Sequence, residues 1–197
     1  MSLVRRLSLN SDNTLKMEPV SATQVLRSRV QLVGETHLPA NQEIQLVGIE
    51  GNTMELNLEI DPQEAREICV DALCSPNCEE YTSMKFYRHG LFVFSQNGRI
   101  RQDTLILDTS RSSLLPDVMA RPPEVAPFEL RNDEPLKLQI FIDKSMVEVF
   151  ANHRQCVALR GYPERQDSLG VSIRAQGRDV VLRSLEAWQM KRIWDKK

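Results

Sequence analysis

Alternation of apolar and polar residues is the strongest pattern along the chain. It is clearest at residues 54–60, where Met, Leu, Leu and Ile alternate with Glu, Asn and Glu. A period of two places successive side chains on opposite faces of a strand. Turn-forming residues flank the segment, at Gly51–Asn52 and Asp61–Pro62. The pattern therefore predicts a half-buried β-strand over residues 54–60.

Short segments of the same kind recur with turn residues between them, including His89–Gly90 and Gln96–Asn97–Gly98. Residues 108–135 differ, because Pro122, Pro123 and Pro127 lack the amide that a central strand needs. We expect a long connection there with at most one edge strand. Further strands are predicted at residues 44–49, 68–73, 82–88, 91–94, 104–107, 156–160, 169–175 and 180–188.

Residues 136–150 predict a β-hairpin with one apolar face. The apolar positions 136, 138, 140 and 142 share that face, and Val147 and Val149 return on it. A tight turn at Asp143–Lys144 would pair Ile140 with Val147 and Leu138 with Val149.

Many short strands and no sustained helical period indicate an all-β fold. We expect a two-sheet antiparallel β-sandwich of the jelly-roll, concanavalin A-like kind. Residues 1–30 have irregular apolar spacing interrupted by Pro19, which predicts an extended lead-in or linker. Residues 31–197 are expected to form the sandwich domain.

Composition narrows the class of protein. With 41% apolar and 26% charged residues the chain is of ordinary globular type, and its net charge of −2 argues against a nucleic-acid partner. No apolar run approaches the roughly 20 residues that span a bilayer, so no membrane partner is expected. A signal peptide is not recognisable near Met1, and the cellular compartment stays open.

The cysteines and histidines are not spaced like metal ligands, and we expect neither a metal nor a cofactor. Cys69, Cys74 and Cys78 lie close together without a Cys-x-x-Cys motif, and Cys156 is distant. Reduced, partly buried thiols are the favoured interpretation, and a disulfide within the first three is the alternative. The histidines are scattered, at His37, His89 and His153.

Two groups of acidic residues are candidates for catalysis. Cleavage of a glycosidic bond needs two carboxyl groups about 5 to 9 Å apart. Glu79 and Glu80 are adjacent in sequence, and a solvated loop edge is the favoured interpretation. Asp143 and Ser145 are interpreted as turn residues that bind local backbone amides, and Glu148 as a surface residue near Gln139, opposite the apolar face. No catalytic residue is assigned.

Aromatic residues make up only 6% of the chain, which disfavours an exposed sugar-stacking platform. Trp188 and Trp194 lie near the C-terminus, where packing in a core or a domain interface is favoured. Tyr81, Tyr87 and Tyr162 are separate in sequence and are not assigned a role.

One segment, LQIFIDKSMVEVFAN at residues 138–152, resembles the signature hairpin of the C-terminal domains of glycoside hydrolase family 32. Further similar segments follow in order at residues 160–163, 169–171, 175–177, 185–190 and 193–194. The lead-in is similar to the segment that leaves the catalytic propeller of that family. The cysteines at residues 69–78 are not explained by the resemblance.

The resemblance implies a β-sandwich attached to an N-terminal five-bladed propeller of the same polypeptide, in an enzyme that hydrolyses sucrose or fructans. The family's catalytic Asn-Asp-Pro, Arg-Asp-Pro and Glu-Cys segments do not occur here, so no catalytic residue is carried over. The implied role is support of the propeller, with contact to sucrose or fructan or a homodimer interface also open. A lectin-like carbohydrate-binding module and a purely structural or oligomerisation domain are the alternatives.

Overall fold

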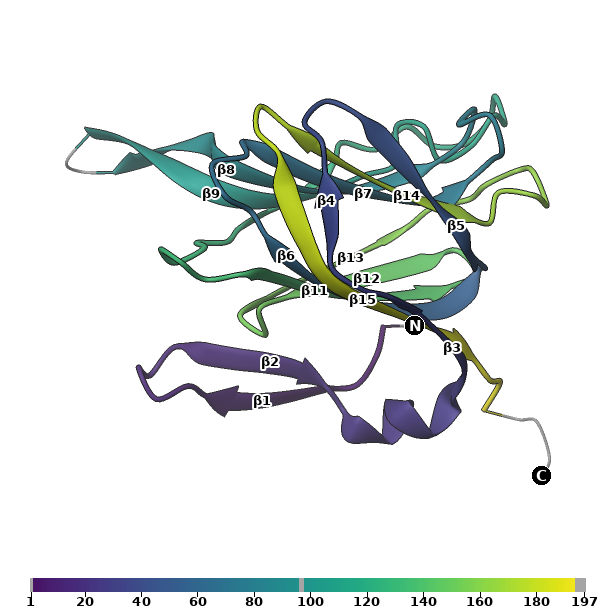
Figure 1. Ribbon diagram of the computed structural model, residues 1–197, viewed down its shortest axis with the longest axis horizontal. Helices are drawn as coiled ribbons and strands as arrows, with labels where there is room; N and C mark the ends of the chain where they lie inside the picture. The colour runs from purple at the N-terminus through teal and green to yellow at the C-terminus, as the bar shows by residue number, and fades with distance from the viewer. Residues whose placement is uncertain (1, 96–97, 194–197) are drawn as a thin grey trace.

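The computed structural model describes residues 2–95 and 98–193, and Figure 1 shows two stacked β-sheets with a small hairpin beneath them. In chain order the elements are β1 (Arg5–Leu9), β2 (Leu15–Pro19), the 3-10 helix η1 (Ser21–Leu26), β3 (Arg27–Val33), β4 (Thr36–Leu38), β5 (Glu43–Glu50), β6 (Thr53–Asp61), β7 (Glu67–Cys74), β8 (Thr82–Ser95), β9 (Gly98–Asp108), β10 (Glu124–Pro127), β11 (Leu136–Asp143), β12 (Met146–Ala151), β13 (Gln155–Arg160), β14 (Gly170–Gln176) and β15 (Val180–Met190).

The two large sheets form an antiparallel sandwich, which confirms the predicted fold class. One sheet has six strands in the order β10-β9-β8-β7-β14-β5. The other has seven strands: six lie in the order β13-β12-β11-β6-β15-β3, and the seventh, β4, pairs with β15 outside this path. Strands that follow each other in sequence, such as β5 and β6, belong to different sheets, so the chain crosses the sandwich repeatedly.

The hydrophobic core fills the space between the sheets. Phe86 and Leu105 enter it from the six-stranded sheet, and Ile140 and Val149 from the seven-stranded sheet. The Phe86 ring meets the Phe128 ring edge-on at a centroid distance of 5.9 Å. Because one face of each strand is buried here, the residues between the core positions point to the outer faces.

The hairpin of β11 and β12 is present, but its predicted register is wrong by two residues. Its turn is Lys144–Ser145 rather than Asp143–Lys144, and Ile140 pairs with Val149. Lys144 adopts a φ of 57°, and its amide donates to the carbonyl of Asn52 at 2.6 Å. Asn52, which accepts this bond, lies outside the hairpin. A shift of two residues leaves every side chain on its predicted face.

The two strands predicted at residues 82–88 and 91–94 are one strand, β8, so the predicted break at His89–Gly90 is wrong. The pairing with β9 is irregular between Tyr87 and Leu91, and His89 has a φ of 54°. The His89 amide donates to Asp103 on β9 at 2.8 Å. A β-bulge therefore absorbs the turn-forming residues without ending the strand.

Residues 1–30 are not simply extended as predicted. They contain the hairpin of β1 and β2, then η1, and Arg27 already begins strand β3 of the sandwich. The hairpin lies on the side of the seven-stranded sheet away from the six-stranded sheet (Figure 1). We call residues 2–26 the lead-in. Its assignment as a linker from another domain stays a prediction.

Residues 108–135 form the predicted long connection, with β10 pairing along the outside of β9 as the one edge strand. The predicted turn residues Gln96–Asn97 and the C-terminal Trp194 lie outside the described residues. Over 2–95 and 98–193, no helix is long and apolar enough to cross a membrane.

Candidate functional site

The outer face of the seven-stranded sheet carries polar side chains from four adjacent strands. Register places Phe150 of β12, Gln139 of β11, Asn57 of β6 and Glu186 of β15 in one row across the sheet. The lead-in covers part of this face, and its hairpin borders a polar groove on the same face. Both features combine residues that are far apart in the sequence.

Glu148 lies under the lead-in, so its interpretation as a surface residue is wrong. Its side chain is 1% exposed. It accepts hydrogen bonds from Arg5 Nη2 at 2.6 Å, from Arg5 Nε at 3.0 Å and from the amide of Leu3 at 2.8 Å. Glu148 does point away from the core, as expected, but its strand neighbour in the hairpin is Phe141 rather than Gln139.

Glu55 is a second buried carboxylate on this face, at 0% exposure. Arg27 at the start of β3 donates to it through Nε at 2.8 Å and Nη2 at 2.6 Å, and Gln139 Nε2 donates at 2.7 Å. The bonds to Glu55 raise the pKa of Arg27 above its ordinary value, against the opposing effect of burial. This pair fixes the point at which the lead-in joins the sandwich.

Trp188 stacks with Arg27, whose guanidinium carbon lies 4.1 Å from the ring centroid. The indole is half-buried on the outer face and is paired with Glu55 in register, so it does not pack in the core. An arginine held over an aromatic face in this way gains cation–π stabilisation.

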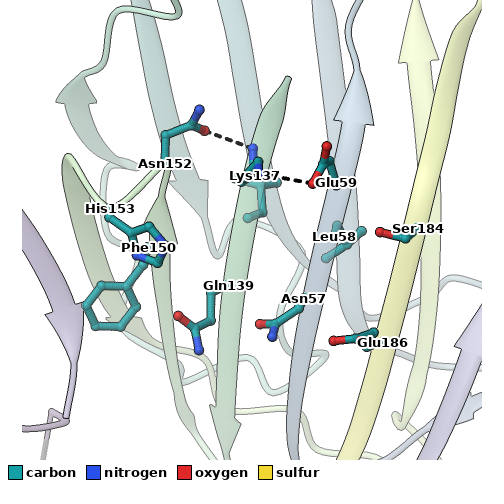
Figure 2. A pocket seen from close by; sticks show the side chains of 11 residues that line it. Asn57, Leu58, Glu59, Lys137, Gln139, Phe150, Asn152, His153, Ser184 and Glu186 are labelled. Atoms are coloured by element: carbon teal, nitrogen blue, oxygen red, sulfur yellow. Dashed lines mark hydrogen bonds and ion pairs between the residues drawn. The ribbon is translucent and has the colours of Figure 1, made fainter. Parts of the chain in front are cut away.

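The polar groove has a cavity volume of about 280 Å³. It is bordered on one side by the turn after β12 and on the other by β15, as Figure 2 shows. The amide of Met17 on β2 donates to the carbonyl of His153 at 2.7 Å, so the lead-in hairpin is tied to the groove's edge. The lining residues are Asn57, Leu58, Glu59, Lys137, Leu138, Gln139, Phe150, Asn152, His153, Ser184 and Glu186.

Two buried atoms of this groove make no hydrogen bond within the described part of the protein, namely Asn57 Oδ1 and His153 Nδ1. Burial lowers the pKa of His153, an effect that Glu18 only partly opposes, so the imidazole is neutral at pH 7. Lys137 Nζ lies 3.1 Å from Glu59 Oε2. The groove thus offers both acceptors and donors.

Asp143 and Glu148 line one cavity of about 550 Å³, and Ser145 does not line it. Asp143 is exposed at the end of β11, and the Ser145 hydroxyl accepts a bond from Arg160 Nη2 at 3.3 Å instead of bonding to a local amide. Glu148 is occupied by Arg5 under the lead-in. The contacts of Glu148 and Ser145 therefore support structural roles for these two residues.

Glu80 is fully buried, so its interpretation as part of a solvated loop edge is wrong. It accepts the Ser168 hydroxyl at 2.6 Å and the amides of Leu114, Glu164 and Arg165 at 2.8 to 3.1 Å. Burial disfavours its ionisation, but these bonds prevail and hold its pKa below the ordinary value. Glu79 beside it is half-exposed and pairs with Arg165 at 2.6 Å.

The four cysteines are free thiols. Cys69 lies on the outer face of the six-stranded sheet and donates to Asp71, which also accepts the Ser83 hydroxyl. Burial raises the pKa of Cys74 and of Cys156 to about 12, so neither forms a reactive thiolate at neutral pH. Among the residues described, no three His, Cys, Asp or Glu side chains are grouped to hold a metal ion.

The tyrosines contact separate partners. Tyr81 lies under Arg111 and Tyr162 under Arg160, at 5.5 and 5.3 Å from guanidinium carbon to ring centroid. Burial raises the pKa of Tyr87 above its ordinary value.

The polar groove is not recognisable from the sequence. A signal existed in the polar positions that alternate with core positions on β6, β11 and β15, but only the register between strands shows that Asn57, Gln139 and Glu186 are neighbours.

The attachment of the lead-in to Glu148 can be measured directly. Glu148→Gln removes the charge that Arg5 binds, and we expect hydrogen exchange in β1 and β2 to quicken about tenfold, because a hydrogen bond to a charged group contributes about 1.5 to 3 kcal/mol. Arg6→Met is the matched control, since Arg6 is exposed and pairs with Glu18 on the hairpin itself. Equal exchange rates in the two variants would contradict the attachment.

Comparison with known proteins identifies the family. The family model described as "Glycosyl hydrolases family 32 C terminal" matches residues 22–189. The chain is 28% identical over 186 residues to sucrose-6-phosphate hydrolase of Staphylococcus xylosus, covering 93% of this chain and 33% of that protein. It is 27% identical over 161 residues to levanase of Bacillus subtilis (strain 168), covering 79% and 21%. It therefore spans a third or less of the length of these relatives.

Solved structures share the fold at low sequence identity. Fructan 1-exohydrolase IIa from Cichorium intybus superimposes with a TM-score of 0.80 at 16% identity, over 95% of this chain and 40% of that one. Sucrose-6-phosphate hydrolase from Lactobacillus gasseri gives a TM-score of 0.62 at 20% identity, over 95% and 33%. The family model covers most of the residues that build both sheets, and the chain thus belongs to glycosyl hydrolase family 32, as a C-terminal domain.

Proposed function

We propose that this domain is the non-catalytic part of an enzyme that hydrolyses sucrose or fructans, and that it holds and stabilises an N-terminal catalytic propeller of the same polypeptide. In this proposal the lead-in comes from the propeller, and the sandwich that begins with β3 supports it. The names of the relatives, sucrose-6-phosphate hydrolase and levanase, support the class of substrate.

The main support for this proposal is the way in which the lead-in is attached to the sandwich. Arg5 and Arg27 stand at its two ends, and each binds a buried carboxylate of the seven-stranded sheet. A chain entering from another domain would therefore be held in one orientation rather than swinging freely. An attachment of this kind limits relative motion between domains, which is otherwise the default.

Exposed apolar side chains on the lead-in support the same role. Val4, Leu7 and Leu9 are 61 to 70% exposed, and Leu15 lies opposite Leu9 in the hairpin. Clustered apolar residues on a surface commonly mark a contact with another protein surface. In this proposal, that surface belongs to the propeller.

The class of the parent enzyme is tested by the coding sequence upstream of this chain. We expect it to encode Asn-Asp-Pro, Arg-Asp-Pro and Glu-Cys segments. The isolated chain should release no fructose from sucrose or inulin. Release at an enzyme-like rate would contradict the assignment as a non-catalytic domain.

The supporting role is tested in the parent polypeptide with Leu7→Asp/Leu9→Asp. We expect its hydrolytic activity to be lost faster on heating while the initial rate with substrate stays unchanged, because the charges disrupt the domain contact and leave the active site intact. Met119→Asp is the control, since Met119 is equally exposed in the connection before β10. Identical thermal inactivation of the two variants would contradict the role.

A second copy of the chain, forming a homodimer, is the alternative partner to the propeller. The open edge strand β3 favours it, because Val30 and Leu32 are exposed there. Light scattering measures the mass of the chain in solution. A strict monomer would contradict dimerisation through the β3 edge.

A further inference from the structure

A β-bulge at the end of β7 decides where the thiol of Cys74 points. Ala72 packs in the core, and strict alternation along the strand would place Cys74 there as well. Leu73 breaks this alternation, because it has a φ of 54° and no register partner on β14. The bulge packs Leu73 into the core and turns Cys74 to the outer face of the six-stranded sheet. This face lies on the opposite side of the sandwich from the lead-in (Figure 1).

Cys78 reaches the same outer face from the loop after β7. Its amide donates to the carbonyl of Ser75 at 2.9 Å, which closes a turn. Its thiol donates to Glu43 Oε1 at 3.8 Å, and Gln45 Nε2 donates to its sulfur at 3.4 Å. Glu43 and Gln45 belong to the edge strand β5, and β14 lies between β5 and β7. The loop therefore brings Cys78 back to side chains two strands away from β7.

Glu43 and Ser172 connect the two thiols. The Ser172 hydroxyl donates to Glu43 Oε1 at 2.6 Å, and the same oxygen accepts the thiol of Cys78. Ser172 also hydrogen-bonds with the thiol of Cys74. Burial raises the pKa of Cys74, and a negative charge on Cys78 raises it further, so the two sulfur atoms lie near each other.

The two thiols differ in their access to solvent. Cys78 is partly exposed, and Cys74 is buried. A dissolved reagent therefore meets Cys78 first. Because burial keeps Cys74 protonated at neutral pH, this thiol does not react with reagents by itself. A reagent that is already attached to Cys78 makes the reaction of Cys74 intramolecular, which removes most of its entropic cost.

We propose that Cys74 and Cys78 form a reversible disulfide by exchange with a small dissolved disulfide such as glutathione disulfide. In the first step Cys78 gives its proton to Glu43, and its sulfur attacks one sulfur of the reagent, whose S–S bond breaks. The departing glutathione thiolate takes up that proton.

In the second step the sulfur of Cys74 attacks the sulfur of Cys78, and the second glutathione leaves. The proton of Cys74 passes through Ser172 and Glu43 to this departing thiolate. Two protein thiols thereby lose two electrons, and one glutathione disulfide is reduced to two glutathione thiols. The site goes beyond the proposed function, because it involves neither hydrolysis nor contact with the propeller.

The loop that this disulfide closes leads directly into Glu80. Ser75 Oγ accepts the amides of Glu79 and Glu80 at 2.8 and 3.1 Å, and the Ser75 amide donates to the carbonyl of Glu80 at 2.9 Å. A covalent link across the loop restricts its opening, so oxidation should slow hydrogen exchange at the amides of Glu79 and Glu80 about tenfold. Unchanged exchange in the oxidised chain would contradict this coupling.

The test exposes the full chain to glutathione disulfide, unfolds it in denaturant with iodoacetamide, and locates the alkylated cysteines by mass spectrometry. We expect the peptide that contains Cys74 and Cys78 to lose two hydrogen atoms and to stay unalkylated, while Cys69 and Cys156 are alkylated. Dithiothreitol should make all four cysteines available for alkylation again.

Variants separate the two steps. Cys74→Ser should accumulate the mixed disulfide of glutathione with Cys78, because the thiol that displaces glutathione is missing. Cys74→Ala, which places no hydroxyl in the buried position, should behave in the same way. Cys78→Ser should form neither the mixed disulfide nor the internal one.

Cys156→Ser is the control, because Cys156 lies on β13 of the other sheet, and it should form the disulfide as the unchanged chain does. Thermal unfolding of each variant shows that it is folded. The proposal is overturned if Cys74 and Cys78 remain open to alkylation, if the disulfide includes Cys69 or Cys156 or links two chains, or if neither Cys74 variant retains glutathione on Cys78.

Discussion

Glu80→Ala is expected to lower the free energy of unfolding by about 4 kcal/mol, because each buried donor left without a partner costs roughly 1 to 3 kcal/mol. The carboxylate accepts the Ser168 hydroxyl and three backbone amides, those of Leu114, Glu164 and Arg165. These donors belong to two separate connections, residues 109–123 and 161–169, which Glu80 ties to the loop after β7. Urea unfolding followed by circular dichroism measures the loss.

The neighbouring residue provides the control for this prediction. Glu79 has a side chain that is 42% exposed and pairs with Arg165 at the surface. Glu79→Ala should therefore cost no more than about 1 kcal/mol, as exposed ion pairs do. Similar losses in the two variants would show that the buried hydrogen bonds of Glu80 do not hold the loops.

The pH dependence of stability gives a second measurement on Glu80. Its pKa in the folded protein is lower than the ordinary carboxyl value. The carboxylate therefore contributes its full stabilisation above the ordinary pKa of about 4.3, and the contribution is lost as the pH falls through the lower folded value. In Glu80→Gln this part of the acid-induced loss should be absent, so stability should depend less steeply on pH below about 4.

Arg27→Met is expected to lower the free energy of unfolding by a similar amount, about 3 to 5 kcal/mol, because it leaves the buried Glu55 without its cation. The side chain of Glu55 is fully buried, and Gln139 would be its remaining side-chain partner in the described structure. Stacking of Arg27 on Trp188 would be lost as well. Thermal and urea unfolding measure the change.

A double variant separates the charge effect from lost packing. Glu55→Gln keeps an acceptor for Gln139 and removes the uncompensated charge, so in the Arg27→Met background it should restore much of the stability. Arg183→Met is the control, because Arg183 is 43% exposed and pairs with the partly exposed Asp61 and Glu59. A loss in Arg27→Met no larger than in this control would show that Glu55 is not held by Arg27.

The predictable part of the candidate site was its local pattern. Alternation identified the strand that carries Asn57 and the hairpin that carries Gln139, and the hydrophobic face placed Glu148 away from the core. What covers that outer face could not be predicted, because Arg5 lies 143 residues from Glu148 and Arg27 lies 28 residues from Glu55. A polar outward position looks the same in sequence whether water or another segment lies over it.

The sequence by itself determined the strands and the fold class, because a period of two and the turn residues are local properties of neighbouring amino acids. It also determined the family, through the hairpin at residues 138–152. Only the tertiary structure decided the register of that hairpin, which depends on the contact of Lys144 with Asn52. The tertiary structure likewise decided that Glu80 and Glu148 are buried, and which residues lie side by side in the groove. Burial and pairing depend on contacts between residues that are distant in sequence, and no local sequence pattern encodes these contacts.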